Sequence, residues 1–144
     1  MGKNNSGVIL SLTERKTNFM IIEKLEHGKN AQELTKVVVR ALMAYKNYVH
    51  TITGDNGTEF ADHENIAKML KTCFFFTHPY SSWEKVAVEN NNKLVRQYIP
   101  KKTDFKNLNN LEIKQIQYKI NNRPRAKLNF YSPKEIFFLL LQNE

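Results

Sequence analysis

Hydrophobic and polar residues along the first third of the chain are spaced as in strands and then as in a helix. Two apolar runs, Val8 to Leu12 and Phe19 to Leu25, flank the polar stretch 13–18. Apolar runs joined by a short polar loop predict a β-hairpin. From Asn30 onward, apolar residues recur every three or four positions, which predicts a long amphipathic helix. These residues are Leu34, Val37, Val38, Ala41, Leu42 and Tyr45.

The middle of the chain has the pattern of strand, helix and strand. The short apolar run Val49 to Thr53 leads into Gly54-Asp55-Asn56-Gly57 and predicts a strand followed by a tight turn. Asp62 is placed to cap a short helix that carries Ile66, Met69 and Leu70. Cys73 to Thr77 is a continuously apolar and aromatic run, which is typical of a strand buried on both faces. We therefore expect Cys73 to be a buried structural thiol.

Helices are predicted in the last part of the chain. One extends from about Lys85 to Tyr98 and ends before Pro100. A second opens near Asn109 and stops at Arg123-Pro124-Arg125. A third has Ser132 as its cap, Pro133 in its first turn and Glu135 closing a capping box. The order of elements predicts one α/β domain, 1–144, with a mixed sheet flanked by helices.

Composition narrows the class of protein. The chain has 144 residues, of which 41% are hydrophobic and 25% charged, as in soluble globular domains. Its longest apolar run, Ile136 to Leu141, is much shorter than the roughly 20 residues of a membrane span, so we expect no membrane partner. The single cysteine excludes a disulfide framework and suits a reducing cytoplasm. The four histidines lack the spacing of metal ligands.

Positive charge is concentrated in one segment. The chain has 22 Lys and Arg against 14 Asp and Glu, a net charge of +8. Ten of the basic residues and only two of the acids lie between Lys93 and Lys127, so this segment accounts for the whole excess. Such a segment fits a polyanion held on one side of the molecule, and a solvated lysine-rich surface is the alternative.

Two acidic residues are candidates for chemistry. Asp55 follows a predicted strand, at the end of a sheet where α/β proteins place their sites, although Asp is also common in ordinary turns. Glu89 lies on the predicted helix with Lys93, Arg96 and Gln97 on one stripe. An ordinary polar helix face explains that stripe equally well. The residues alone leave both alternatives open.

Several segments together resemble a known family. They are Leu10-Ser11-Leu12-Thr13-Glu14-Arg15-Lys16-Thr17, then Ile52-Thr53-Gly54-Asp55-Asn56-Gly57-Thr58-Glu59-Phe60, His78-Pro79-Tyr80-Ser81-Ser82-Trp83-Glu84, Glu89-Asn90-Asn91-Asn92, Leu94 to Lys101, Leu108 to Arg125 and Ser132-Pro133. In this order they are similar to the DDE transposases of bacterial insertion sequences, in particular the family named after insertion sequence 30. The segments extend over nearly the whole chain.

The resemblance implies a ribonuclease-H-like integrase core that cuts and joins DNA at the ends of a mobile element. Asp55 and Glu89 would be the second and third members of a catalytic carboxylate triad and would bind Mg²⁺ or Mn²⁺. DNA would be the partner, the intact enzyme a homo-oligomer, and its location the bacterial cytoplasm and nucleoid. The residues expected to contact DNA are Trp83, Lys93, Arg96, Lys101, Lys102, Arg123 and Arg125.

The family's first catalytic Asp, on the central strand of its sheet, would fall before Gly2-Lys3. We therefore expect a sheet without its central strand and no strand transfer by the chain alone, unless another acid such as Glu14 or Glu59 completes the site. The strands on either side would then close on each other, accept a strand from a second molecule, or leave the central position empty. We expect one of the last two outcomes. A non-catalytic DNA-binding or dimerising remnant is the main alternative function, and a host ribonuclease-H-like nuclease is a weaker one.

Overall fold

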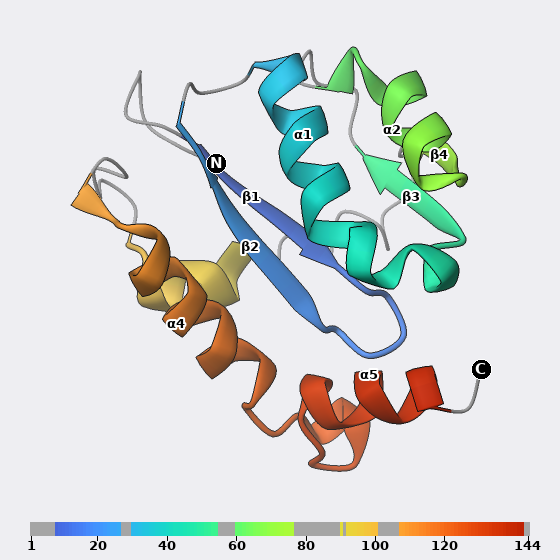
Figure 1. The fold of residues 1–144 in the computed structure, drawn as a ribbon. Helices are drawn as coiled ribbons and strands as arrows, with labels where there is room; N and C mark the ends of the chain where they lie inside the picture. The colour runs from blue at the N-terminus through green and yellow to red at the C-terminus, as the bar shows by residue number, and fades with distance from the viewer. Residues whose placement is uncertain are drawn as a thin grey trace.

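The computed structural model describes residues 8–26, 30–54, 60–76, 90, 92–100 and 107–142. Strands β1 (Val8–Thr13) and β2 (Met20–Leu25) form the predicted antiparallel hairpin, with Thr13 opposite Met20 (Figure 1). The Glu14 carboxylate orders the connecting loop. It accepts hydrogen bonds from the Lys16 and Thr17 backbone N–H groups and from the Thr17 hydroxyl, at 3.0, 2.7 and 2.6 Å.

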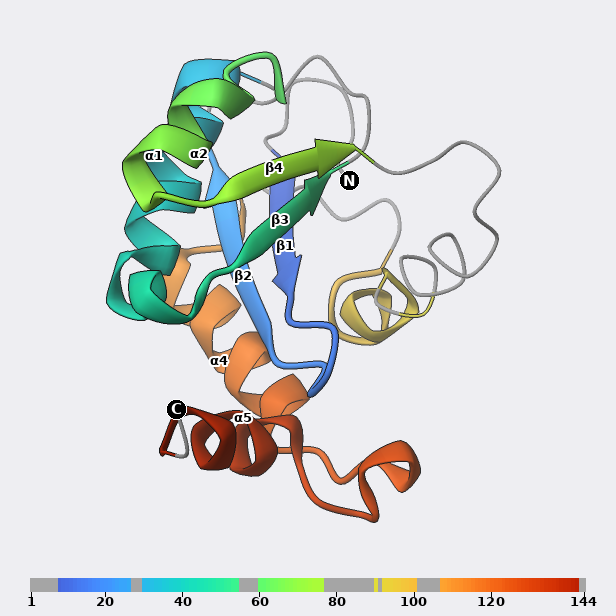
Figure 2. The same ribbon diagram turned by 90° about the vertical axis from the view of Figure 1, so that its right-hand side faces the viewer.

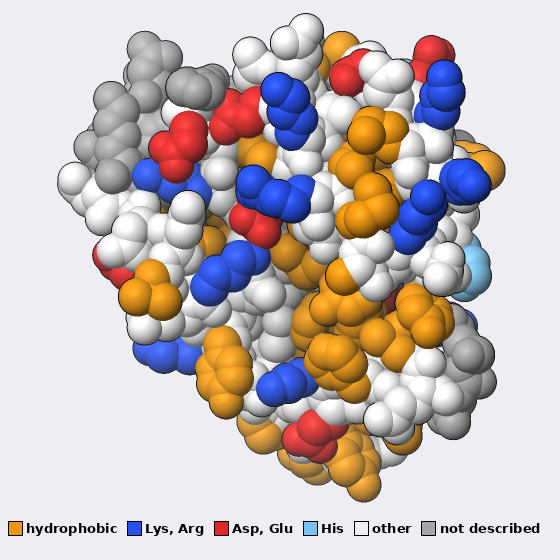
Figure 3. Space-filling model, in the orientation of Figure 1, with side chains coloured by type: hydrophobic (Ala, Val, Ile, Leu, Met, Phe, Trp, Pro, Cys, Tyr) orange, Lys and Arg blue, Asp and Glu red, His pale blue; other side chains and the backbone are white. Residues whose placement is uncertain are grey.

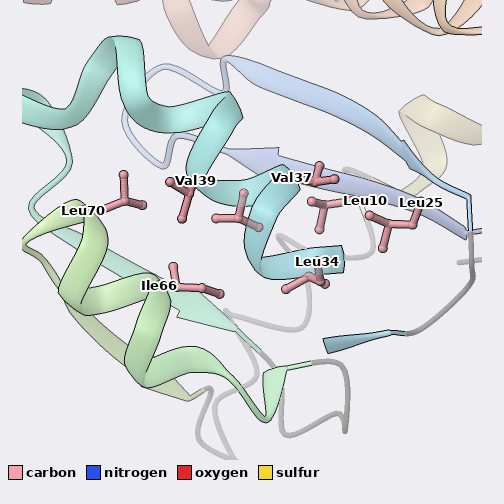
Figure 4. Packing of buried hydrophobic residues seen from close by; sticks show 8 residues of the cluster. Leu10, Leu25, Leu34, Val37, Val39, Ile66 and Leu70 are labelled. Carbon is pink, nitrogen blue, oxygen red and sulfur yellow. The ribbon is translucent and has the colours of Figure 1, made fainter. Parts of the chain in front are cut away.

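One helical layer covers the hairpin and a second pair of strands. It consists of α1 (Ala31–Leu42), which continues as the 3₁₀ segment η1 (Met43–Tyr48), and α2 (His63–Leu70). The Asn30 side chain caps α1 by accepting from the Glu33 N–H at 3.0 Å. The apolar stripe of α1 packs with α2 and the hairpin in a buried cluster (Figure 4), whose members are Leu10, Leu25, Leu34, Val37, Val38, Val39, Ile66 and Leu70.

Strands β3 (Thr51–Gly54) and β4 (Cys73–Phe76) form a parallel pair. Ile52 and Phe74 pack against the α1 and α2 cluster, so one face of this pair is covered. The prediction that β4 is buried on both faces is wrong, because Cys73 is exposed and Phe75 is 54% exposed. Successive side chains of a strand point to opposite faces, and α2 covers only the face that carries Phe74 and Phe76.

The expected cap of α2 is also wrong. Asp62 precedes the helix, but its carboxylate caps no backbone N–H; its Oδ1 atom accepts from the Asn65 side chain at 2.6 Å instead. The backbone of Asp62 is not extended, with φ −96° and ψ 23°, and an N-cap residue is normally extended. Met69 faces solvent, while Ile66 and Leu70 hold the helix in the core.

A second layer covers the opposite face of the hairpin. It consists of α4 (Asn110–Asn121) and the helical segment 92–98. The buried residues of this layer and of the hairpin form a second cluster, Ile9, Met20, Ile22, Val95, Ile99, Ile113 and Ile120. Helix α5 (Pro133–Gln142) follows the short η4 (Ala126–Leu128) and begins with the predicted Ser132 cap. Phe137 of α5 stacks on Phe19 beside the hairpin loop, with ring centroids 4.2 Å apart.

Side chains of α4 make hydrogen bonds along the outer edge of β2. Asn121 accepts from Met20 N–H at 2.8 Å and donates to Met20 C=O at 2.7 Å. Gln117 accepts from Ile22 N–H at 2.9 Å, and the Lys114 ammonium donates to Ile22 C=O at 3.2 Å. The spacing of three and four residues puts these three side chains on one face of the helix. We call them the α4 polar stripe.

The four strands form two separate sheets within the described part of the chain. β1 pairs with β2, and β3 pairs with β4, but β1 and β3 are not hydrogen-bonded to each other. Figures 1 and 2 show β3 and β4 beside the hairpin on the β1 side, with β1 and β3 running in opposite directions. Direct closure of these two strands, the arrangement we did not expect, is therefore absent from the described residues.

We predict that Asn121→Ala destabilises the domain by about 2–4 kcal/mol, because it leaves two buried backbone groups of Met20 without partners. The matched control is Asn122→Ala, whose amide donates to Tyr118 C=O at an exposed site and which we expect to cost less than about 1 kcal/mol. Urea denaturation of both variants measures the difference. Equal losses would show that the α4 polar stripe does not stabilise the edge of β2.

Candidate functional site

Strand β3 ends at the first candidate carboxylate. Gly54 is its last residue, and Asp55 follows directly in the chain. A Cβ atom at position 54 would lie 2.8 Å from the Phe74 ring, closer than side chains tolerate, so a residue without a side chain is needed here. Phe60 and His63 also contact this ring, with centroids 5.6 and 5.5 Å from it. An aromatic cluster of Phe60, His63 and Phe74 thus packs at the end of β3.

Asp55 and Glu89 lie outside the described residues, and so do Trp83, Lys101 and Lys102. The expected approach of the two carboxylates to within about 10 Å, a reach set by two ions and their ligand bonds, therefore stays a prediction. In the described part of the chain, no three His, Cys, Asp or Glu side chains gather in a way that fits a metal ion.

The helical segment 92–98 confirms the predicted orientation of its two faces. Val95 is fully buried, and Tyr98 packs against the same cluster. Lys93 and Gln97 are exposed, and Arg96 is partly exposed, with its guanidinium donating to Pro100 C=O at 3.4 Å. This polar face is the one on which the sequence pattern puts Glu89.

Arg123 and Arg125 have structural partners that the sequence did not indicate. Arg123 donates to the Gln97 side chain at 2.6 Å and so connects the end of α4 to the helical segment 92–98. Arg125 donates to Ile120 C=O at 3.1 Å and caps the carboxyl end of α4. Burial lowers the pKa of Arg125, and the charge of Arg123 lowers it further. Whether these two side chains also contact DNA stays a prediction.

Glu14 is a poor substitute for a missing catalytic acid. Its carboxylate already accepts three hydrogen bonds within the hairpin loop, from Lys16 and Thr17. A metal ion there would have to displace the contacts that order the loop. Glu59, the other acid considered, lies outside the described residues.

The surface has an apolar area that the sequence pattern does not indicate. In the view of Figure 3, hydrophobic side chains gather over the lower part of the molecule, where Figure 1 places α5. Phe138, Leu139 and Leu140 of α5 are 39%, 54% and 38% exposed. This apolar area does not belong to a membrane-spanning helix, because none of the described helices is long and apolar enough to cross a membrane.

The chain is similar in sequence to curated transposases and in fold to a solved integrase core. No protein-family profile matches the chain. The chain is 50% identical over 137 residues, 95% of its length, to the transposase of insertion sequence IS4351 from Bacteroides fragilis. It is 33% identical over 136 residues, 94% of its length, to the transposase of IS30A from Escherichia coli K12. The matches cover 42% and 35% of those proteins, so the chain spans less than half the length of these relatives.

The fold is shared with a viral integrase. The crystal structure of the catalytic core domain of BIV integrase matches 99% of this chain and 92% of that chain with a TM-score of 0.71, at 17% sequence identity. This likeness confirms the predicted ribonuclease-H-like α/β architecture, and the relatives confirm the family resemblance. The chain is therefore a homologue of the IS30 and IS4351 insertion-sequence transposases and has the fold of an integrase catalytic core.

Proposed function

We propose that this chain is catalytic-core sequence of a DDE transposase, which cuts DNA at the ends of a mobile element and joins them to a target. The observation that carries the proposal is the match of 95% of the chain to the IS4351 transposase at 50% identity. The integrase-core fold supports it. A host ribonuclease-H-like nuclease has no comparable support from these relatives.

The proposed metal site consists of Asp55 and Glu89. Carboxylate oxygens are the ligands that Mg²⁺ and Mn²⁺ prefer, so these two residues fit such ions chemically. Asp55 follows Gly54, whose backbone lies close to the Phe74 ring. The sequence pattern puts Glu89 on the stripe continued by the exposed Lys93. Divalent ions bound there would activate the attacking oxygen and stabilise the leaving oxygen of a phosphodiester.

DNA would be held by basic side chains near that site. Lys93 lies one helical turn after Glu89 in the sequence and is exposed, and Arg96 lies on the same face. Contacts of lysine and arginine with phosphates position the duplex without reading its sequence. The intact enzyme, which must bring element ends and target together, is proposed to act as a homo-oligomer.

We predict that Asp55→Asn weakens Mn²⁺ binding to the chain, because an amide replaces a charged ligand. In the ¹⁵N-labelled protein, Mn²⁺ should broaden the amide signals of Gly54 and Asn90, which adjoin the two carboxylates, before those of α5. The matched control is Glu64→Gln, an exposed acid on α2. Unchanged broadening in Asp55→Asn would contradict the metal site and favour a non-catalytic DNA-binding remnant.

We predict that the chain binds duplex DNA of unrelated sequences with similar affinity and that this affinity falls steeply with salt. The double substitution Lys93→Ala, Arg96→Ala should reduce the slope of log K against log salt by about 2, since each lost phosphate contact is worth roughly 0.9. Fluorescence anisotropy measures the slope. The control pair, Lys36→Ala with Lys68→Ala, lies on exposed positions of α1 and α2. An equal reduction in the control pair would indicate net charge rather than a DNA-contacting face.

A further inference from the structure

The connection between α4 and α5 presents two aromatic side chains to solvent. Phe130 is 75% exposed and Tyr131 is 54% exposed. Figures 1 and 2 show this connection at one end of the molecule, beyond the carboxyl end of α4. Among the large apolar residues that the structure describes, Phe130 is the most exposed. Single exposed apolar side chains are common, so the assignment of a role needs further observations.

The backbone of Phe130 has an unfavourable conformation. Its φ is 67°, and that of the preceding Asn129 is 55°, so two successive residues lie in the left-handed region. Asn tolerates this region, whereas a bulky side chain seldom occupies it. Strained backbone of this kind persists only where surrounding contacts fix it, and it is enriched at functional sites. The exposed ring of Phe130 is therefore presented at a cost to the stability of the fold.

Hydrogen bonds fix the loop that carries these two residues. Arg125 N–H donates to Tyr131 C=O at 3.1 Å, and Phe130 N–H donates to Arg125 C=O at 2.8 Å. Tyr131 N–H donates to Leu128 C=O at 3.1 Å. The next residue, Ser132, is buried and caps α5. A backbone that is ordered in advance loses little conformational entropy when a ligand binds, which suits a binding surface.

Positive charge accompanies the exposed rings. The sequence from Ile113 to Lys134 contains six basic residues and no acidic residue. One of the six, Lys114, pairs with Glu23. The other five are Lys119, Arg123, Arg125, Lys127 and Lys134. The Lys134 ammonium also lies 5.4 Å from the ring centroid of Tyr118, a third exposed aromatic residue. Surfaces that bind single-stranded nucleic acids combine basic side chains for the phosphates with aromatic rings on which bases stack.

We propose that Phe130 and Tyr131 are a stacking platform for unpaired bases of DNA, with the exposed Arg123 and Lys127 contacting the adjoining phosphates. This inference rests on the proposed function and adds base contacts to its phosphate contacts. A base must be unpaired to stack on a side chain, and the strand ends produced by cutting at an element end offer such bases. The surrounding cations favour a polyanion over an apolar protein surface.

Two labelled oligonucleotides test the platform on the complete chain by fluorescence anisotropy. One is a single-stranded DNA of 12 nucleotides, and the other is an abasic strand of the same length, which keeps the phosphates and lacks the bases. We expect the strand with bases to bind at least fivefold more tightly, as one stacked base provides. Phe130→Ala and Phe130→Leu should remove this difference without changing abasic binding, whereas Phe130→Trp should keep it. The matched control is Phe75→Ala, an exposed ring on β4, which should bind as the unaltered chain does.

A glycine variant separates binding from folding. Glycine adopts a φ of 67° without strain, so Phe130→Gly should lose the preference for bases while its urea midpoint does not fall. A loss of the preference only together with a lower midpoint would show that Phe130 serves the fold, and would overturn the platform.

Equal binding of the two oligonucleotides, or an equal effect of Phe75→Ala, would overturn the platform and leave the phosphate contacts of the proposed function standing. Failure of the unaltered chain to bind these oligonucleotides or duplex DNA would contradict DNA as the partner, and the platform with it. Dissociation of a dimer by Phe130→Ala with unchanged DNA binding would assign the loop to a second copy of the chain instead.

Discussion

The hydrogen bonds between the α4 polar stripe and β2 are the constraint on which the arrangement of the hairpin depends. Asn121 and Gln117 act toward Met20 and Ile22 as a neighbouring strand would, and Lys114 completes the set. An exposed strand edge invites pairing with other chains, and this stripe closes the outer edge without another strand. The same helix buries Ile113 and Ile120 against the hairpin, so one element supplies both apolar contacts and hydrogen bonds.

The elements that adjoin the proposed carboxylates lie away from this outer edge: β3 beside β1, and the segment 92–98 in the α4 layer. The α1 and α2 layer packs against β3, which ends at Gly54, the residue directly before Asp55 in the sequence. In the opposite layer, Val95 and the following Ile99 bury the segment 92–98 in the second cluster, and Arg123 connects this segment to α4 through Gln97. The two elements that adjoin the proposed carboxylates are thus attached to different cores, and the hairpin contributes to both.

The sequence predicted the parts of the fold that depend on local pattern. The hairpin, the caps at Asn30 and Ser132 and the helix starting near Asn109 follow from periodicity and capping residues. The exposed face of β4 was not predictable, because an apolar run does not reveal which of its faces another element covers. Asn121 is about a hundred residues from Met20 in the chain, so no local pattern indicates their contact. Of the candidate site, the polar face with Lys93 was predicted, whereas the structural partners of Arg123 and Arg125 were not.

The most direct measurement is native-state hydrogen exchange of the free chain by NMR, because it compares the two edges of one hairpin. The amides of Met20 and Ile22 should be strongly protected, since Asn121 and Gln117 accept from them. The backbone groups of Ile9 and Ser11 point away from β2 and have no backbone partner in the described part of the chain, so their amides should exchange much faster despite the burial of Ile9. Equal protection at all four amides would contradict the account of one closed and one open edge.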